Sequence, residues 1–415
     1  MTGAEHPLPD GPPGAPGPAP GPGVVLSAPG DAGPDLRYSD TEDELRAAVR
    51  ALLADRERGW SDRGERTGAT DPTGAAHRTD HVDPAPFLTR AESGDPYDRG
   101  LWHTLATGIG AAGLLVPERL GGQGASHREA AVVLEELGRT VTPAPYLTGS
   151  VVATETLLAL DTGRPELSEL LAAVASGHRI AVLAVPFATS PYGPLPTGAP
   201  RITGVADAAV ADVLLVPRPD GLYAVDASDV TLEALTPLDL TRPLAAVSSP
   251  DGRGTRLGDP VAATAAVRRG LLTGAGLLAS EQLGVAVRCL EETVRHTRER
   301  HQFNRPVGSF QALKHRMARM WLEIVSARAA ARNAADALAT GGPDTAVAVA
   351  VAQAYASGVA VRAAEECVQL HGGTGMTWEH PAHLFLKRAK SAEIAFGTPG
   401  RHKAALADLV TLPAP

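Results

Sequence analysis

The sequence predicts a mainly α protein in which a small β-domain lies between two helical bundles. Alanine, the best helix former, is abundant, and aromatic residues make up only 4% of the 415 residues. Apolar residues recur at helical spacing before about residue 178 and after about residue 259. Between these parts, short apolar runs are bounded by Pro, Gly and Asp, which is typical of strands. The order helices, strands, helices indicates an inserted β-domain.

The N-terminal part is expected to contain a disordered tail and then a helical domain. Residues 1–38 are dominated by Pro, Gly and Ala and cannot bury enough apolar surface to offset the entropy of ordering. Residues 39–178 form the helical domain, with a long Gly/Pro-rich loop predicted at 60–96. Its predicted helices lie at 39–57, 101–115, 126–140, 150–162 and 166–177.

The remaining chain is divided into a β-domain at 179–258 and a C-terminal helical bundle at 259–415. Within the β-domain, strands are predicted at 179–186, 210–217 and 221–227. Helices are predicted at 261–300, 309–340 and 343–371. The last is apolar nearly all round, which is typical of a helix buried in a bundle or in an oligomer interface.

Composition excludes some functions. The net charge of −9 and the absence of a long basic run argue against a nucleic-acid partner. We expect no apolar stretch of about 20 residues and hence no membrane span. The N-terminus also lacks the basic and apolar regions of a signal peptide. Cys289 and Cys367 have no metal-ligand spacing, so we expect buried core thiols in a reducing, cytoplasmic environment.

Four ordered stretches carry motifs. They are GLLVPERLGGQGASHREAAVVLEELGRTVTPAPYL at 113–147, RERHQFNRPVGSFQALKHRMARM at 298–320, QLHGGTGMTWEHPAHLFLKRAK at 369–390 and IAFGTPGRHKAAL at 394–406. Together they resemble the acyl-CoA dehydrogenase family over about residues 40–410. The resemblance implies that family's fold and an FAD-dependent α,β-dehydrogenation of an acyl-CoA thioester.

The resemblance also assigns cofactor contacts, because the second and third stretches bind FAD across a subunit interface in that family. An arginine suits a pyrophosphate, glutamine amides suit the adenosine, and glycines allow close backbone approach. The implied contacts are Arg300, Phe303, Gln311, Gln369, Gly372, Gly373 and Thr398. From the residues alone, Arg300 would be interpreted as a solvated side chain at the end of a helix. The two glycines would be interpreted as a helix C-terminus and turn, and Phe303 and Phe310 as core residues.

The family's catalytic carboxylate is missing. In most members a glutamate immediately before the Gly-Thr turn takes the α-proton while the flavin takes the β-hydride. Here that position is Phe396, and the family's other location is close to Gly274. Residues 184–200 also lack the acidic Gly-Ser-Asp stretch, and no lysine follows where the family holds the flavin ring. The chain therefore keeps motifs for the far end of FAD and loses those for the flavin end.

This pattern resembles the partner subunits of heteromeric acyl-CoA dehydrogenases from actinobacterial steroid side-chain breakdown, so we expect a homo- or hetero-oligomer with another such subunit. Three alternatives remain open: a self-sufficient dehydrogenase using Glu379 or Glu281 as base, a flavin-dependent oxygenase of the same fold, and a non-catalytic assembly subunit. We expect no metal at His380 and His383, because no third ligand is evident. Glu379 is instead expected to pair with Lys387, with Arg388 or with a neighbouring helix. The acyl chain and the electron acceptor are not identified by the sequence.

Overall fold

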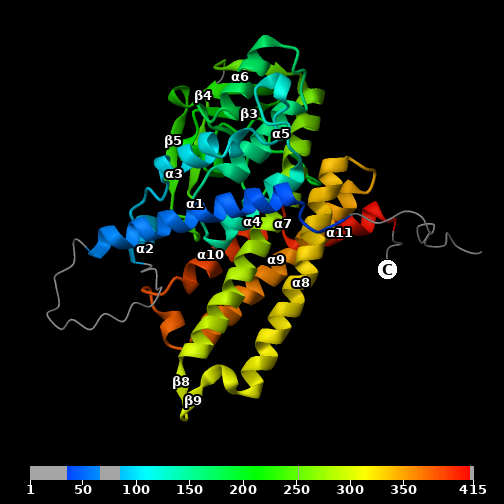
Figure 1. The fold of residues 1–415 in the computed structure, drawn as a ribbon. Coiled ribbons are helices and arrows are strands. Elements are labelled where there is room, and N and C mark those ends of the chain that lie inside the picture. Colours follow the sequence, from blue (N-terminus) through cyan, green and yellow to red (C-terminus); the bar gives the residue numbers. More distant parts are fainter. Residues whose placement is uncertain (1–34, 66–84, 251, 412–415) are drawn as a thin grey trace, which may run out of the picture. The chain divides into compact units, whose positions relative to one another are not determined.

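Helices occupy the N-terminal part of the chain, as the periodicity predicts (Figure 1). The computed structural model describes residues 35–65, 85–250 and 252–411, so the predicted tail lies almost wholly outside the described residues. The elements are α1 (Asp40–Glu65), α2 (Ala85–Glu92), α3 (Arg99–His103), α4 (His127–Arg139), α5 (Thr154–Leu158) and α6 (Pro165–Ala175), with π-helical turns η1 (Thr104–Gly108) and η4 (Tyr146–Ala153).

The long loop predicted at 60–96 is wrong at both ends. Helix α1 continues to Glu65, and α2 covers eight residues from Ala85. The loop was predicted because this stretch is polar and contains Gly and Pro. Charged residues are nevertheless good or tolerable helix formers, and an isolated glycine such as Gly59 costs only about 1 kcal/mol. Residues 66–84 lie outside the described part.

Helix α4 is fixed at its start and packs closely against the central helix of the C-terminal bundle, α7 (Pro260–Glu299). Its N-terminus has a capping box between Ser126 and Glu129. A Cβ on Gly138 would lie 2.1 Å from the backbone oxygen of Glu281 in α7. No side chain fits there, so the two helices approach through their backbones and the position of Glu281 is fixed.

Two small sheets form the middle of the chain. One has the order β1-β3-β4-β7 and the other the order β2-β6-β5; only the β1–β3 pair is parallel in these two sheets. The strands are β1 (Ala181–Leu183), β2 (Ile202–Ala206), β3 (Val213–Arg218), β4 (Gly221–Asp226), β5 (Thr231–Leu235), β6 (Leu244–Ser248) and β7 (Thr255–Gly258). The three strands predicted from sequence are confirmed as β1, β3 and β4.

The C-terminal part is a helical bundle built around α7. It adds α8 (Gln311–Thr340), α9 (Thr345–His371), α10 (Ala382–Ile394) and α11 (Pro399–Leu409), and a two-stranded hairpin, β8 (His301–Gln302) and β9 (Arg305–Pro306), links α7 to α8. The three long helices predicted here are confirmed, and α8 and α9 lie side by side as a helical hairpin (Figure 1). Residues from Leu36 onward form one compact unit, so the three-domain division stays a prediction.

Two helices are more apolar than we expected. By length and composition alone, α7 and α9 could cross a membrane, so the expectation that no such stretch exists is wrong. Within the structure, 89% of the apolar window of α7 and 61% of that of α9 are buried. Core helices of globular proteins pass the same test. Cys289 on α7 and Cys367 on α9 are both buried, as predicted.

Candidate functional site

A sharp turn joins α10 to α11 at the position where the family's catalytic glutamate is expected. Phe396 (φ 51°) and Gly397 (φ 104°) both have left-handed backbones. The Phe396 N–H donates to the carbonyl of Phe187 (2.9 Å), and Nε2 of His402 donates to the Phe396 carbonyl (3.2 Å). Burial lowers the pKa of His402 to about 4, so its ring stays neutral. The turn is therefore held on both sides by groups of this chain.

The Phe396 ring fills the space at this turn. It is 3% exposed and meets the Phe187 ring edge-on, with centroids 5.2 Å apart. A Cβ placed on Gly274 of α7 would lie 3.0 Å from Cζ of Phe396 and 2.6 Å from Cγ2 of Val152. The two positions predicted for the base therefore meet in space. Neither offers a proton acceptor, and the Phe396 N–H is already bonded within the chain.

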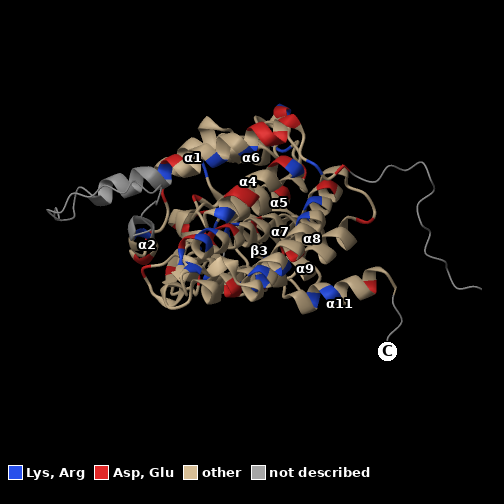
Figure 2. Ribbon diagram, turned by 60° about the horizontal axis from the view of Figure 1, so that its bottom comes forward, with Lys and Arg blue, Asp and Glu red and all other residues tan. Residues whose placement is uncertain are grey.

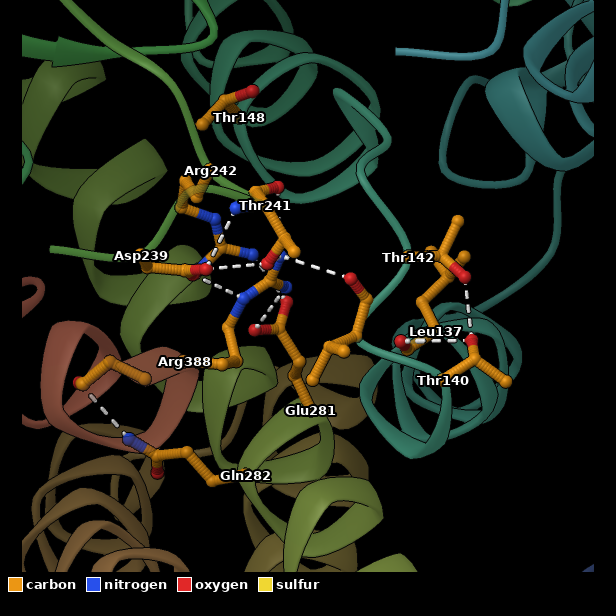
Figure 3. A network of polar contacts seen from close by, with 12 residues as sticks. Leu137, Thr140, Thr142, Thr148, Asp239, Thr241, Arg242, Glu281, Gln282 and Arg388 are labelled. Atoms are coloured by element: carbon orange, nitrogen blue, oxygen red, sulfur yellow. Dashed lines mark hydrogen bonds and ion pairs between the residues drawn. The ribbon is translucent and has the colours of Figure 1, made fainter. Parts of the chain in front are cut away.

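Glu281, one of the two alternative bases, is held in an ion-pair network (Figure 3). It is 2% exposed; its Oε2 accepts from Arg242 (2.6 Å) and its Oε1 from Arg388 (3.2 Å). Burial raises the pKa of this carboxyl, but the guanidiniums of Arg242 and Arg388 more than offset that effect and hold the pKa below its usual range. A carboxylate so stabilised is a poor base, and it lies about two helical turns from Gly274.

The same network links the β-domain to the bundle. Arg388 of α10 is 1% exposed and donates to Asp239 (2.6 Å) and to the hydroxyl of Thr241 (2.6 Å), both in the loop between β5 and β6. Four charges are thus buried with their partners (Figure 3). Sequence reasoning missed this cluster. The available signal was the pair of isolated charges in the apolar run PLDLTRPLA at 237–245.

Glu379, the other alternative base, is exposed and lies at the opposite end of α10 from Phe396, roughly 20 Å away along the helix. The expected pairing with Lys387 or Arg388 is wrong. Lys387 lies over the ring of Trp378 (4.4 Å), and Arg388 belongs to the buried network. Among the described residues Glu379 makes no ion pair.

A cavity of about 490 Å³ opens beside the Phe396 turn. One wall is the 186–196 segment, which replaces the family's flavin-ring motif, and the other contains Gly397, Thr398 and Arg401. Arg268 of α7 holds the first wall by donating to the carbonyl of Pro191 (2.9 Å). The Thr398 hydroxyl accepts from the Arg401 N–H (3.4 Å) and caps α11. We call the residues around this cavity the flavin end, because the resemblance places the flavin-ring motif and the catalytic base in these segments.

The residues that the resemblance assigns to the ADP half of FAD lie at the end of the bundle where α7 and α9 finish. We call this place the ADP end. Arg300 caps the C-terminus of α7, and its guanidinium makes no hydrogen bond or ion pair within the described residues. The β8–β9 turn follows, with Phe303 (φ 52°) and Asn304 (φ 59°) at its two central positions. Such a two-residue turn requires positive φ at both positions, and asparagine tolerates it well. Asn304 therefore preserves the geometry of the glycine usual in the family.

The glycine-rich loop after α9 and two glutamines also lie at the ADP end, where they are exposed. Gln311 begins α8 and Gln369 lies in the last turn of α9; both are exposed. A Cβ on Gly372 or Gly373 would meet nothing within 4 Å, so a ligand can approach this backbone. Gly372 has φ 62° and ψ −137°, a conformation that favours glycine. Gly375 instead packs internally, since its Cβ would lie 2.5 Å from the Val368 oxygen.

Three histidine rings lie close to one another where these segments meet. The ring of His371, just before Gly372, lies 4.3 Å from the ring of His296 on α7 and 4.5 Å from that of His380. The ends of α7 and α9 therefore meet beside the open loop. Within the described residues no group of three metal-ligating side chains is arranged to hold a metal.

The flavin end and the ADP end are far apart within this chain. Arg268 touches the flavin-end loop, and Arg300 ends the same helix about 48 Å further on. Along α9 the separation is roughly 37 Å, because Tyr192 of the flavin-end loop contacts Ala346 and the Gly-rich loop follows His371. These distances separate the two groups of residues that the resemblance assigns to the two halves of FAD.

Comparison with known families decides the identity of the fold. Residues 79–178 match the acyl-CoA dehydrogenase N-terminal domain, and residues 264–410 match the acyl-CoA dehydrogenase C-terminal domain. The chain belongs to the acyl-CoA dehydrogenase family. The resemblance and the mainly α fold inferred from the sequence are thereby confirmed. This is a family of flavoprotein oxidoreductases that act on CH–CH groups.

Individual relatives support the same assignment. The chain is 37% identical to acyl-CoA dehydrogenase IpdE2 of Mycolicibacterium smegmatis over 320 residues, covering 77% of this chain and 90% of that protein. One chain of the ChsE4–ChsE5 complex of Mycobacterium tuberculosis superimposes with a TM-score of 0.75 at 25% identity, over 92% of this chain and 100% of the other. The Tcur3481–Tcur3483 steroid ACAD variant gives a TM-score of 0.72 at 25% identity, over 90% and 98%.

Proposed function

We propose that this chain is one subunit of a heteromeric FAD-dependent acyl-CoA dehydrogenase. In this proposal it binds the ADP half of an FAD whose flavin ring and catalytic base lie in a second subunit. The observation that carries the proposal is the separation of the two ends. The residues suited to the ADP half are exposed and lie about 48 Å along α7 from this chain's own flavin-end loop.

The residues at the ADP end fit the group they would hold. Arg300 offers a charged fork of donors without a competing carboxylate among the described residues, which suits a pyrophosphate. Gly372 and Gly373 leave room for a phosphate to approach the backbone. The exposed amides of Gln311 and Gln369 can donate to and accept from the adenosine. When bound, FAD would supply the acceptor for the β-hydride of the acyl-CoA.

The residues at the flavin end support a heteromer in which the catalytic base comes from the second subunit. With Phe396 against Gly274, no carboxylate of this chain lies at either family position of the base. Glu281 is bound to two arginines, and Glu379 lies beyond the far end of α10. The self-sufficient alternative therefore has no candidate base among these residues. The second subunit would supply the glutamate that removes the α-proton.

The substrate class follows from the family and its relatives. We propose an acyl-CoA thioester, and steroid-derived acyl chains are the first to test because one structural relative is a steroid ACAD. The test is to purify the chain alone, and together with a second family member that has an intact glutamate. FAD content, measured by absorbance, and dye reduction by acyl-CoA should appear only in the complex. Stoichiometric FAD and full activity in the isolated chain would overturn the proposal.

A further inference from the structure

A small cavity lies where the N-terminal helices meet the β-domain. Its volume is about 240 Å³. Its walls come from α3, from the loop after α4, from the connection between α6 and β1, and from the connection between β2 and β3. The described residues that line it are all different from those that line the cavity at the flavin end. Small ligands often bind between domains. We call this space the α3 cavity.

Apolar groups form a wall of the α3 cavity that is already fixed in the folded chain. Pro143 and Pro145 line it and are buried, and a proline ring fixes φ and offers no N–H. Tyr97 also lines it, and its hydroxyl donates to the buried Asp207, which accepts from Thr148 as well (2.6 Å). The apolar body of a ligand can therefore pack here without rearranging the wall.

Helix α3 presents three donor side chains to the cavity. Arg99, Trp102 and His103 all line it, and their spacing of three and four residues places them on one side of the helix. Nε1 of Trp102 is buried without a hydrogen-bond partner among the described residues, and an indole N–H can only donate. The side chains of Arg99 and His103 make no hydrogen bond or ion pair within the described part of the chain. Because buried donors are rarely left unpaired, the cavity lacks an acceptor.

The acidic side chains of the cavity already have donors. Burial raises the pKa of Asp98, but the Leu101 N–H (3.0 Å) and the Arg56 guanidinium (2.6 Å) more than offset this and hold the pKa below its usual range. Asp212 accepts from the Ile180 N–H (2.8 Å). The missing acceptor must therefore come from a ligand. A ligand with one negative charge suits the site better than a phosphate dianion, whose second charge would face Asp98 and Asp212.

The rest of the chain does not attract anions in general. Its net charge is −9, and in the view of Figure 2 Lys and Arg are interspersed with Asp and Glu along the helices. An anion bound at the α3 cavity would therefore be held by the local donors and not by a broad basic surface.

We propose that the α3 cavity binds a compact organic monocarboxylate, with its apolar body against the proline wall and its carboxylate at the donors of α3. The cavity is smaller than the roughly 300 Å³ at the lower end of ordinary ligand pockets, so it is too small to enclose a CoA thioester. All of its described lining belongs to this chain. The site therefore does not depend on the proposed heteromer.

The test is a calorimetric titration of the full-length chain with benzoate, cyclohexanecarboxylate and acetate, and with benzyl alcohol as an uncharged compound of similar size. At least one cyclic carboxylate should saturate the chain and bind about 10-fold or more tightly than benzyl alcohol, because only the carboxylate makes charged hydrogen bonds. Acetate lacks the apolar body and should bind more weakly. Equal affinity for the cyclic carboxylates and benzyl alcohol, or no saturable binding of any carboxylate, would overturn the proposal.

Variants locate the binding site on α3. Arg99→Gln should weaken binding of the tighter carboxylate by about 10-fold, and Trp102→Phe, which keeps an aromatic body and removes the donor, by about 5-fold. The matched control is Arg119→Gln, which removes the same charge from an exposed arginine outside the cavity and should leave binding unchanged. Arg99 is exposed, so its variant keeps the test decisive if Trp102→Phe lowers the melting temperature. Equal losses for Arg99→Gln and Arg119→Gln would place the anion elsewhere and overturn the site.

Discussion

Two phenylalanines occupy matching backbone conformations at opposite ends of the C-terminal bundle. Phe396 has φ 51° and Phe303 has φ 52°, values rare for bulky residues. Phe396 is 3% exposed and packs against Phe187, whereas Phe303 is 86% exposed and meets the Phe310 ring edge-on, with centroids 6.1 Å apart. At the flavin end the chain covers its own strained residue; at the ADP end it leaves that residue uncovered.

The two turns keep this conformation for different reasons. At Phe396 the buried ring gains hydrophobic and aromatic contacts that offset the cost of a left-handed backbone, about 1–2 kcal/mol. At Phe303 the exposed ring gains little, and the two-residue turn between β8 and β9 itself requires the positive φ. We call the buried turn the closed end and the exposed turn, with the glycine-rich loop beside it, the open end. The following predictions test this contrast.

The largest effect concerns catalysis at the closed end. The isolated chain should dehydrogenate acyl-CoA thioesters at least 10²-fold more slowly than the complex, because a positioned carboxylate contributes roughly 10²–10⁴-fold. Dye reduction with several acyl-CoA substrates measures this. Phe396→Glu tests which part is missing. Gained activity in the isolated variant would identify the carboxylate as the main defect, and no gain would point to the flavin pocket.

The second prediction concerns the free energy of unfolding and the buried network of Asp239, Arg242, Glu281 and Arg388. Glu281→Gln leaves Arg242 and Arg388 without a full counter-charge, so the free energy of unfolding should fall by about 3–5 kcal/mol in urea titrations. Glu233→Gln is the control. It breaks an exposed pair with Arg201 and should change stability by no more than about 0.5 kcal/mol.

The same variant gives a pH test with a defined sign. The pKa of Glu281 is lowered in the folded chain, so its stabilisation is fully present above the ordinary glutamate pKa of about 4.3 and is lost as pH falls through the folded value. The stability gap between the parent chain and Glu281→Gln should therefore shrink on acidification. A gap that stays constant down to acid unfolding would contradict the ion-pair role.

At the open end, Arg300→Ala should weaken FAD binding by the complex by about 1–3 kcal/mol, the value of a hydrogen bond to a charged group. Stability should hardly change, since the side chain is exposed. Arg298→Ala, two residues earlier and also exposed, is the matched control and should retain FAD. Fluorescence titration of the apo complex with FAD distinguishes them. Equal losses for both variants would indicate a general charge effect.

The smallest effects are expected from alanine substitutions at the two adjacent glycines. Gly372→Ala tests the backbone conformation of the loop, and Gly373→Ala tests whether a ligand needs the space beside it. Gly372→Ala forces a side chain into φ 62° and should cost about 1–2 kcal/mol of stability. Gly373 is helical (φ −55°) with open space at its Cβ, so Gly373→Ala should not destabilise the chain. If a phosphate approaches this backbone, Gly373→Ala should nevertheless lower FAD affinity. Unchanged affinity would place the phosphate elsewhere.

Local patterns in the sequence were sufficient for the long helices and the family. The apolar periodicity of 261–300 and 343–371 extends over many turns, and few alternatives satisfy it. The assigned cofactor residues were found because motifs place them, and the structure brings Arg300, Gln369 and Gly372 to one open end. Their contact with FAD stays a proposal.

Contacts between distant segments could not be predicted in the same way. Phe187, Gly274 and Phe396 meet only in the folded chain, and no spacing rule links them. Glu281 could be proposed as a base only because its two arginine partners, far away in sequence, were unknown. The loop predicted at 60–96 was wrong at its two ends for another reason. Charged residues are compatible with both helix and loop, so composition does not decide between them.

The contact between Phe396 and Gly274 also constrains how this protein can evolve. A Cβ gained at position 274 would lie 2.6 Å from Cγ2 of Val152 and 3.0 Å from Cζ of Phe396. A base could therefore return at 274 only with room made at both neighbours, whereas a glutamate at 396 replaces a single residue and inherits the existing turn. A family tree should accordingly show a larger residue at 274 together with a change at 152, and not after loss of the aromatic residue at 396 alone.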